Sequence, residues 1–257
     1  MPFPNVQLTR RPLHFIYLCD CSGSMQADGK MQSLNQAIRQ SLPAMVEVSQ
    51  QNPEASILVR VVSFASQASW HLAEPTPPEQ VLHGWVDLKE GGLTAMGEAL
   101  KLVSAALRTP PMEERALPPV LVLISDGAPT DDFIGGLRTL MAEPWAAKAV
   151  RLAIAIGHDA DLDTLQQFIG PDNGRAGGAG VGPGGDRMPG QRSARRPLQA
   201  NDSNTLARYI QWASTAVVGA ASQPRSQIGG AVSEGNVPLP DLPPTLLDLN
   251  DPSQVVW

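Results

Sequence analysis

The sequence predicts an α/β fold in which a doubly wound, mostly parallel sheet carries helices on both faces. Short apolar runs, typical of buried parallel strands, alternate with segments whose apolar residues recur every three or four positions. Strands that alternate with helices form right-handed β–α–β units, and these units build such a sheet. The length of 257 residues is sufficient for one large domain, or for a smaller domain with appended segments.

The first half of the chain opens on a strand pattern. The run LHFIYL is short, apolar and aromatic, and a turn rich in serine and glycine follows it. The next segment has apolar residues at helical spacing, and Pro43 inside it is expected to kink the helix. A proline-rich stretch further on indicates a loop. The elements expected here are a strand over 13–18, a helix over 30–49, a strand over 56–64, an edge strand over 69–72 and a loop over 75–93.

The second half continues the alternation. The runs VLVLIS and VRLAIAI are bounded by turn residues and fit central parallel strands. The segments between and after them have apolar residues at helical spacing. The elements expected here are helices over 94–108 and 131–142, strands over 120–125 and 150–156, and helices over 160–169 and 204–220.

Two segments break this pattern, so we expect one domain over 1–220 with an insert over 171–197, followed by a tail over 221–257. The insert holds eight glycines and five arginines. It is expected to be a flexible surface loop, with an anion contact as the alternative. The tail holds six prolines and is net acidic, and we expect it to be disordered on its own. Its apolar end, LPPTLLDLNDPSQVVW, leaves docking on a partner as an alternative.

The composition argues against several classes of partner. The formal net charge of −6 disfavours nucleic acid, because phosphate binding needs a concentrated basic surface. No apolar run approaches the roughly 20 residues of a membrane-spanning helix, so no membrane contact is expected. The first residues lack the apolar core and cleavage site of a secretion signal. The two cysteines, Cys19 and Cys21, are expected to be buried free thiols, which favours a cytoplasmic location.

Polar side chains follow the predicted strands at three places. Asp20, Ser22 and Ser24 come directly after the first strand, Thr94 opens a helix after two glycines, and Asp126 ends a central strand. The carboxyl ends of parallel strands meet at one edge of a sheet, where ligands bind. Carboxylate and hydroxyl oxygens are hard ligands that suit Mg²⁺ or Mn²⁺ rather than zinc. The sequence therefore predicts one metal site built from these five side chains.

An ordinary structural role is the alternative for each of these residues. The hydroxyl groups could cap helices, and Asp126 could begin a turn. Polar groups follow at three places where predicted strands end or a helix begins on the same side of the sheet, and this coincidence favours the metal site. Because only two of the five side chains carry a negative charge, a bound divalent cation stays electrophilic and can accept an acidic group from a partner.

At this point the sequence resembles a known family. The segment DCSGS matches the D-x-S-x-S signature of the von Willebrand factor A (VWA) domain, which has a Rossmann-like fold. The metal-ion-dependent adhesion site (MIDAS) of that family also uses a threonine and an aspartate. The resemblance implies that the serines and the threonine meet the metal directly or through water, and that the aspartates often act through water. It gives these roles to Asp20, Ser22, Ser24, Thr94 and Asp126.

A wider set of motifs is similar to the TerY-like subfamily of bacterial tellurium-resistance and stress operons. They spread over about residues 12–215 and include GGLTAMGEAL, PVLVLISDGAPTDDF, AIAIGHDADLDTLQQFIG and NDSNTLARYIQWAS. In this subfamily the protein is usually encoded beside a serine/threonine kinase and a metal-dependent phosphatase, and it is thought to join them. The resemblance therefore implies a cytoplasmic scaffold in bacterial phosphorylation signalling.

These observations predict a non-enzymatic, Mg²⁺- or Mn²⁺-dependent scaffold for protein partners. By resemblance the partners are a kinase and a phosphatase, one of which supplies an acidic residue to the metal. A metal-dependent hydrolase is an alternative, although the serines do not lie in a G-x-S-x-G elbow and no general base is paired with a nucleophile. The third alternative is a partner of a ring ATPase, as in magnesium chelatase.

Three further residues near the predicted strand ends have two interpretations each. Asp131 and Asp132 could support the metal from behind, or they could interact with the dipole of the helix that they open. His158 could lie near the ligand edge, although packing at the entry of a helix is the favoured interpretation.

Overall fold

The computed structural model describes residues 10–170, 196–222, 240 and 242–243. The insert expected over 171–197 lies outside the described residues, apart from its last two positions. The tail expected over 221–257 lies outside them too, apart from a few positions. The expectations for both segments therefore stay predictions.

The centre of the fold is a six-stranded sheet with the order β3-β2-β1-β4-β5-β6. Neighbouring strands are parallel, except that β2 and β3 pair antiparallel at one edge. This arrangement confirms the predicted doubly wound, mostly parallel α/β fold. The strands are β1 (Arg11–Asp20), β2 (Ala55–Phe64), β3 (Ala68–Thr76), β4 (Val120–Ser125), β5 (Val150–Ile156) and β6 (Leu198–Ala200).

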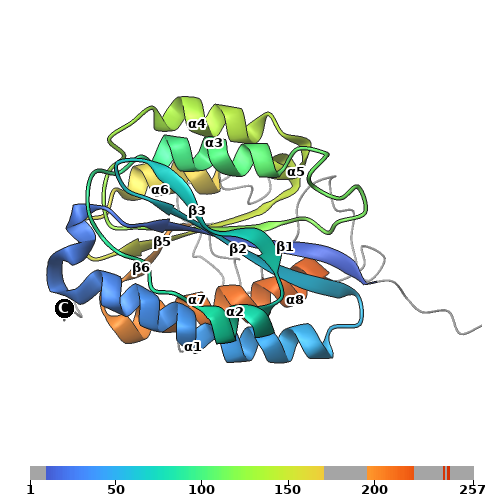
Figure 1. Ribbon diagram of the computed structural model, residues 1–257. Helices are drawn as coiled ribbons and strands as arrows, with labels where there is room; N and C mark the ends of the chain where they lie inside the picture. Colours follow the sequence, from blue (N-terminus) through green and yellow to red (C-terminus); the bar gives the residue numbers. More distant parts are fainter. Residues whose placement is uncertain (1–9, 171–195, 223–239, 241, 244–257) are drawn as a thin grey trace, which may run out of the picture.

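The helices cover the sheet in two layers (Figure 1). One layer contains α3, α4, α5 and α6, and the opposite layer contains α1, α2, α7 and α8. No helix in the described part of the chain is long and apolar enough to cross a lipid bilayer. The helices are α1 (Lys30–Gln51), α2 (Pro78–Gly84), α3 (Met96–Ala106), α4 (Phe133–Met141), α5 (Pro144–Lys148), α6 (Leu162–Ile169), α7 (Ser203–Trp212) and α8 (Val218–Ser222).

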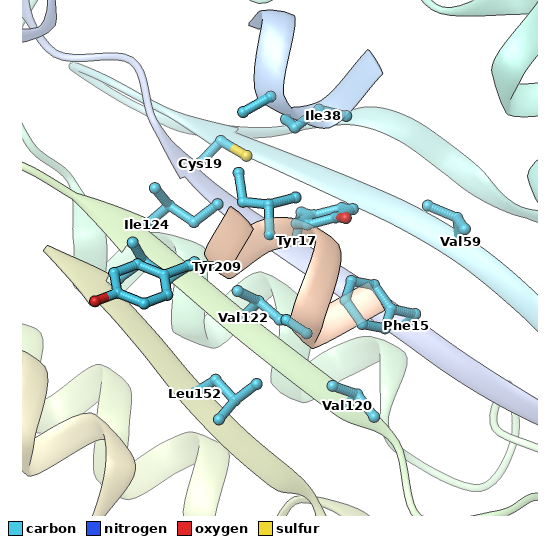
Figure 2. Packing of buried hydrophobic residues seen from close by; sticks show 14 of the residues in the cluster. Phe15, Tyr17, Cys19, Ile38, Val59, Val120, Val122, Ile124, Leu152 and Tyr209 are labelled. Carbon is cyan, nitrogen blue, oxygen red and sulfur yellow. The ribbon is translucent and has the colours of Figure 1, made fainter. Parts of the chain in front are cut away.

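Each face of the sheet packs against its own layer, because successive side chains of a strand point to opposite faces. Phe15, Tyr17 and Cys19 of β1 join the core beneath α1 and α7, as Figure 2 shows. Ile16 and Leu18, which alternate with them, pack against the α3 layer instead. All five side chains are fully buried, so β1 contributes to both cores.

One buried hydrogen bond joins the first strand to the middle of the last described helical segment, 203–222. Tyr17 Oη lies 2.8 Å from Ser214 Oγ, which belongs to a π-helical stretch (Ala213–Val217) between α7 and α8. The Ser214 hydroxyl donates to the carbonyl of Ile210 at 2.6 Å, so the Tyr17 phenol is the donor to Ser214. Burial raises the pKa of Tyr17 to about 12.

The strands and longer helices lie where the sequence predicts them, but three short elements do not. The expected loop over 75–93 is wrong in part, because α2 forms inside it. Pro78 lies in the first turn of α2, where the backbone N–H group that proline lacks would have no partner within the helix. The segments α5 and β6 are also unpredicted, and α5 likewise begins with a proline. The helix α1 is continuous through Pro43.

Candidate metal centre

Loops from several parts of the chain meet at the carboxyl edge of the sheet. The loop after β1 is fixed to the end of β2, because Cys21 donates from its backbone N–H to the carbonyl of Phe64 at 2.8 Å. The same loop pairs with the segment before α3: Gly91 donates to the Cys21 carbonyl at 2.8 Å, and Gly23 donates to the Gly92 carbonyl at 3.0 Å. These backbone contacts bring together the segments that carry the predicted metal ligands.

Gly92, in the segment before α3, packs tightly against the loop after β2. Its φ of +90° is one that side-chain-bearing residues rarely adopt, and a Cβ atom placed there would lie 2.4 Å from Ser66 Oγ. The glycine therefore lets the segment before α3 turn tightly against the loop after β2. Thr94 follows two residues later.

Asp20 is the innermost member of the predicted site and is completely buried. Its Oδ1 accepts a 2.8 Å hydrogen bond from the backbone N–H of Ser22, and its Oδ2 accepts a 2.5 Å bond from the hydroxyl of Ser125. Burial raises the pKa of Asp20 above its ordinary value, although the hydrogen bonds from Ser125 and Ser22 oppose this effect. The ionised carboxylate is thus held in place at a cost that a nearby cation would offset.

A chain of hydrogen bonds continues outward from Asp20. The hydroxyl oxygens of Ser22 and Ser24 are 2.9 Å apart, and Ser24 Oγ donates to Asp126 Oδ1 at 2.7 Å. Asp20, Ser22 and Asp126 are buried, whereas Ser24 is exposed. The cluster is therefore accessible to solvent on the side of Ser24.

Thr94 reaches the same edge by a different route. Its backbone N–H donates to Thr130 Oγ1 at 3.0 Å, and its carbonyl accepts from the backbone N–H of Thr130 at 2.9 Å. The structure thus brings Asp20, Ser22, Ser24 and Asp126 together through hydrogen bonds. Thr94 is buried nearby, and among these five described residues it alone has no such bond to another member.

Lys30, the first residue of α1, is a member of this cluster that the sequence analysis missed. Its side chain is 6% exposed, and its Nζ donates to Asp126 Oδ2 at 2.9 Å. Asp159 Oδ1 lies 3.5 Å from the same Nζ. Burial disfavours the charged ammonium, but the hydrogen bond and charge of Asp126 prevail and raise the pKa of Lys30. Nothing in the order of residues distinguishes this lysine from a solvent-exposed one at the start of a helix.

A pocket of about 380 Å³ lies beside the cluster. It is lined by residues of the turn before α1 and of the loop after β5, together with one of the predicted ligands. His158 is exposed and lines this pocket, so it does not pack at the entry of a helix as the favoured interpretation held. The lining residues are Ser24, Ala27, Asp28, Lys30, Gly157, His158 and Asp159.

The acidic pair after β4 has a structural role. Asp132 is the N-cap of α4 and accepts from the backbone N–H of Gly135 at 2.9 Å, in line with the helix interpretation. Asp131 caps a different helix, because its two oxygens accept from the N–H groups of Gly97 and Glu98 in α3. Asp131 therefore ties the start of α3 to the loop after β4.

The donor set fits a hard divalent cation. It consists of carboxylate and hydroxyl oxygens only, and the described residues contain no group of three His, Cys, Asp or Glu side chains arranged to hold a metal. Oxygen-only sites with few carboxylates suit Mg²⁺ and Mn²⁺, which retain several waters. The cysteines take no part: both are buried free thiols, as predicted.

Comparisons with known proteins agree with the α/β fold described above. Residues 15–128 match the family model described as von Willebrand factor type A domain. No curated protein sequence matches the chain significantly.

Among solved structures, proximal thread matrix protein 1 from the mussel byssus, with a zinc-occupied MIDAS motif, is similar at a TM-score of 0.57 and 18% identity. The similarity covers 82% of this chain and 48% of that one. The pilus adhesin SpaC from Lactobacillus rhamnosus GG is similar at a TM-score of 0.56 and 12% identity, over 81% of this chain and 31% of that one. The chain thus spans about half the length of the mussel protein. At these identities the similarity shows the fold alone.

Proposed function

We propose that this chain, whose residues 15–128 match the model of the von Willebrand factor type A domain, is a metal-dependent protein-binding module. The observation that carries the proposal is the cluster of side-chain oxygens of Asp20, Ser22, Ser24 and Asp126. Hydrogen bonds link its members, and the bond to Asp20 comes from the backbone N–H of Ser22. These oxygens are preorganised at the edge of a rigid parallel sheet, where ligands of such folds bind. The cation that we propose is Mg²⁺ or Mn²⁺.

The charges of the site support binding rather than catalysis. Asp20 and Asp126 supply the negative charges that would attract the cation, and the hydroxyl groups add none. A bound divalent cation supplies Lewis acidity and an open coordination position. The chain's own residues would leave such a cation accessible to a partner on the side of Ser24, since Ser24 is the exposed member of the cluster. A carboxylate of a partner protein is the group that we expect there.

The serine hydroxyls have no partner that would make them nucleophiles. Ser24 donates to Asp126, and Ser22 shares a hydrogen bond with Ser24. No histidine accepts a hydrogen bond from either hydroxyl in the described part of the chain. Serine nucleophiles need an adjacent base. The arrangement therefore favours a non-enzymatic role, with hydrolysis as an outcome that the experiment below detects.

As partners we propose a serine/threonine kinase and a metal-dependent phosphatase of a bacterial tellurite or stress response, one of which supplies the acidic residue. This proposal depends on the similarity of the motifs over about residues 12–215 to TerY-like proteins. The free cysteines Cys19 and Cys21 support a reducing compartment such as the cytoplasm.

The decisive experiment is a Mn²⁺ titration of the purified protein, followed by electron paramagnetic resonance. We expect one bound Mn²⁺ that Mg²⁺ displaces, and a large loss of affinity in Ser22→Ala. The matched control is Ser56→Ala, because Ser56 lies at the start of β2, at the opposite edge of the sheet. An unchanged Mn²⁺ affinity in Ser22→Ala would contradict the proposed site.

Partner capture completes the test. Tagged protein is incubated with purified candidate kinase, phosphatase or ring ATPase, in Mg²⁺ and in EDTA. Capture that needs both Mg²⁺ and the Ser22 hydroxyl supports the scaffold. Capture that depends on neither Mg²⁺ nor the Ser22 hydroxyl would mean that the partner binds away from the metal site. Turnover of generic phosphatase or esterase substrates, lost in Asp20→Ala, would contradict the non-enzymatic role.

A further inference from the structure

Lys30 is a buried cation that shares a carboxylate with the proposed metal. It follows a sharp turn in which Asp28 and Gly29 both have positive φ values, 53° and 68°. This turn sets the first residue of α1 against the sheet edge instead of in solvent. As a result the Lys30 ammonium contacts Asp126 from the side opposite to Ser24: Oδ2 faces the lysine, and Oδ1 faces the serine.

The ammonium has a second carboxylate within reach. Asp159 Oδ1 is 3.5 Å from Lys30 Nζ, and the Asp159 side chain is 77% exposed. Gly157 makes room for this approach, because a Cβ atom there would lie 3.3 Å from Nζ and 3.1 Å from Asp159 Oδ1. The lysine can therefore change partners by a small movement of its flexible end, without leaving the pocket.

The charges make this change of partner favourable when a cation binds. Without metal, the buried charges of Asp20 and Asp126 are partly neutralised by Lys30. A divalent cation on the Asp126 carboxylate repels the ammonium, and repulsion between charges a few ångströms apart is strong where water is scarce. Asp159 lies further out and its side chain is exposed, so it offers the ammonium a nearby counter-charge.

We propose that Lys30 is an internal counter-cation that competes with the divalent ion for Asp126, and that Asp159 receives its ammonium when the ion is bound. The inference rests on the proposed function, since it assumes that the Asp20–Asp126 cluster is a metal site. Lys30 then sets the metal affinity of the site below that of the oxygen cluster alone. Metal binding is also coupled to the loop after β5, which lines the pocket beside Ser24.

The first test removes the charge of the lysine. Lys30→Met keeps the length and apolar stem of the side chain, and we expect it to bind Mn²⁺ about tenfold more tightly than the wild type, as for a coupling of ordinary size. The control is Lys89→Met, which removes the same charge from an exposed residue. Lys30→Gln, which keeps a hydrogen-bond donor for Asp126, serves if Lys30→Met does not fold.

The second test is a double-mutant cycle with Asp159. Asp159→Asn removes the alternative partner of the ammonium, so we expect a weaker Mn²⁺ affinity when Lys30 is present. In the Lys30→Met background the same substitution is expected to have little effect. Such non-additivity is the signature of two residues that act through each other. An equal effect of Asp159→Asn in both backgrounds would overturn the exchange of partners.

Thermal unfolding gives a readout that does not depend on the titration. In EDTA, Lys30→Met is expected to unfold at a lower temperature than the wild type, because Asp126 loses its counter-charge, and saturating Mn²⁺ is expected to restore the stability. If the wild type binds Mn²⁺ and Lys30→Met binds it equally or more weakly, the competing role of Lys30 is overturned, but the proposed metal site is not. If neither protein binds Mn²⁺, the proposed function itself fails.

Discussion

The carboxylate of Asp131 accepts hydrogen bonds from the backbone N–H groups of Gly97 and Glu98, each at 2.8 Å. Asp131 thereby caps α3 from outside, since Ala95, at the N-cap position of α3, has no side-chain acceptor to offer. Thr94 lies just before this capped turn. The position of the predicted threonine ligand thus depends on a residue outside the predicted ligand set.

We therefore expect Asp131→Ala to lower the free energy of unfolding by about 1 kcal/mol, the usual cost of losing a helix cap. The same change is expected to weaken Mn²⁺ binding, because the segment that carries Thr94 loosens. Urea unfolding and the Mn²⁺ titration measure the two effects. Glu114→Ala removes one exposed negative charge and is the control. An Asp131→Ala protein as stable as this control would refute the capping role.

The contact between α3 and α4 predicts a large loss of stability. A Cβ atom on Gly97 would lie 2.3 Å from the Asp132 carbonyl oxygen, and one on Gly136 would lie 2.4 Å from the Gly97 carbonyl oxygen. Both clashes are with backbone, so the helices must separate. We expect Gly97→Ala to destabilise the protein by about 3 kcal/mol, at the upper end for overpacking. Gly84→Ala, with no atom within 4 Å of the added Cβ, is expected to be nearly neutral in the same denaturation assay.

The buried charge of Asp20 predicts a trade between stability and binding. In EDTA at pH 7, Asp20→Asn is expected to unfold at a higher temperature than the wild type, because it no longer buries an ionised carboxylate. Mn²⁺ is expected to stabilise the wild type only. Thermal scans with and without the ion test both points, and a less stable metal-free variant would be the contrary result.

The direction of the pKa shift gives the pH dependence of this trade. The folded protein holds the Asp20 proton more tightly than the unfolded chain, whose ordinary value is 3.8. The free energy of unfolding of the metal-free wild type therefore falls as the pH rises from 3.8 through the raised pKa of Asp20. Above the raised pKa, the full cost of burying the ionised carboxylate is present. The advantage of Asp20→Asn is expected to shrink as the pH is lowered toward 4, which scans at several pH values measure.

The two thiols predict slow chemical labelling. Burial raises the pKa of Cys21 to about 12, and it raises that of Cys19 well above its ordinary value. Because the thiolate is the reactive form, neither cysteine is expected to react with a disulfide reagent at pH 8 until the structure opens. Labelling kinetics followed by mass spectrometry, with urea-unfolded protein as the reference, test this. Fast reaction of one thiol in the folded protein is the opposing result.

The sequence predicts the sheet well for a physical reason. The strands β4 and β5 are uninterrupted apolar runs between turn residues, and they lie where predicted, at 120–125 and 150–156. The elements that escape prediction are short: β6 has three residues and α5 has five. Elements of that length have no periodic pattern, and their existence depends on contacts with the rest of the fold.

The same distinction holds for the site. Asp20, Ser22, Ser24 and Asp126 come together because parallel strands end at a common edge, which the order of elements already implies. Lys30 was not predicted, because its position depends on a turn with two positive φ values and on the loop after β5. The pairing of Asp131 with α3 likewise depends on which helices become neighbours.

The hydrogen bond between Tyr17 and Ser214 bears on how the chain is made. The ribosome synthesises β1 early, yet one face of that strand is covered in part by the helical segment 203–222, which is translated nearly two hundred residues later. Until then α1 is present to cover this face, but the Tyr17 phenol lacks its partner Ser214. Domain closure therefore waits for the end of synthesis of the 203–222 segment, and nascent chains stalled before it are expected to aggregate or be degraded.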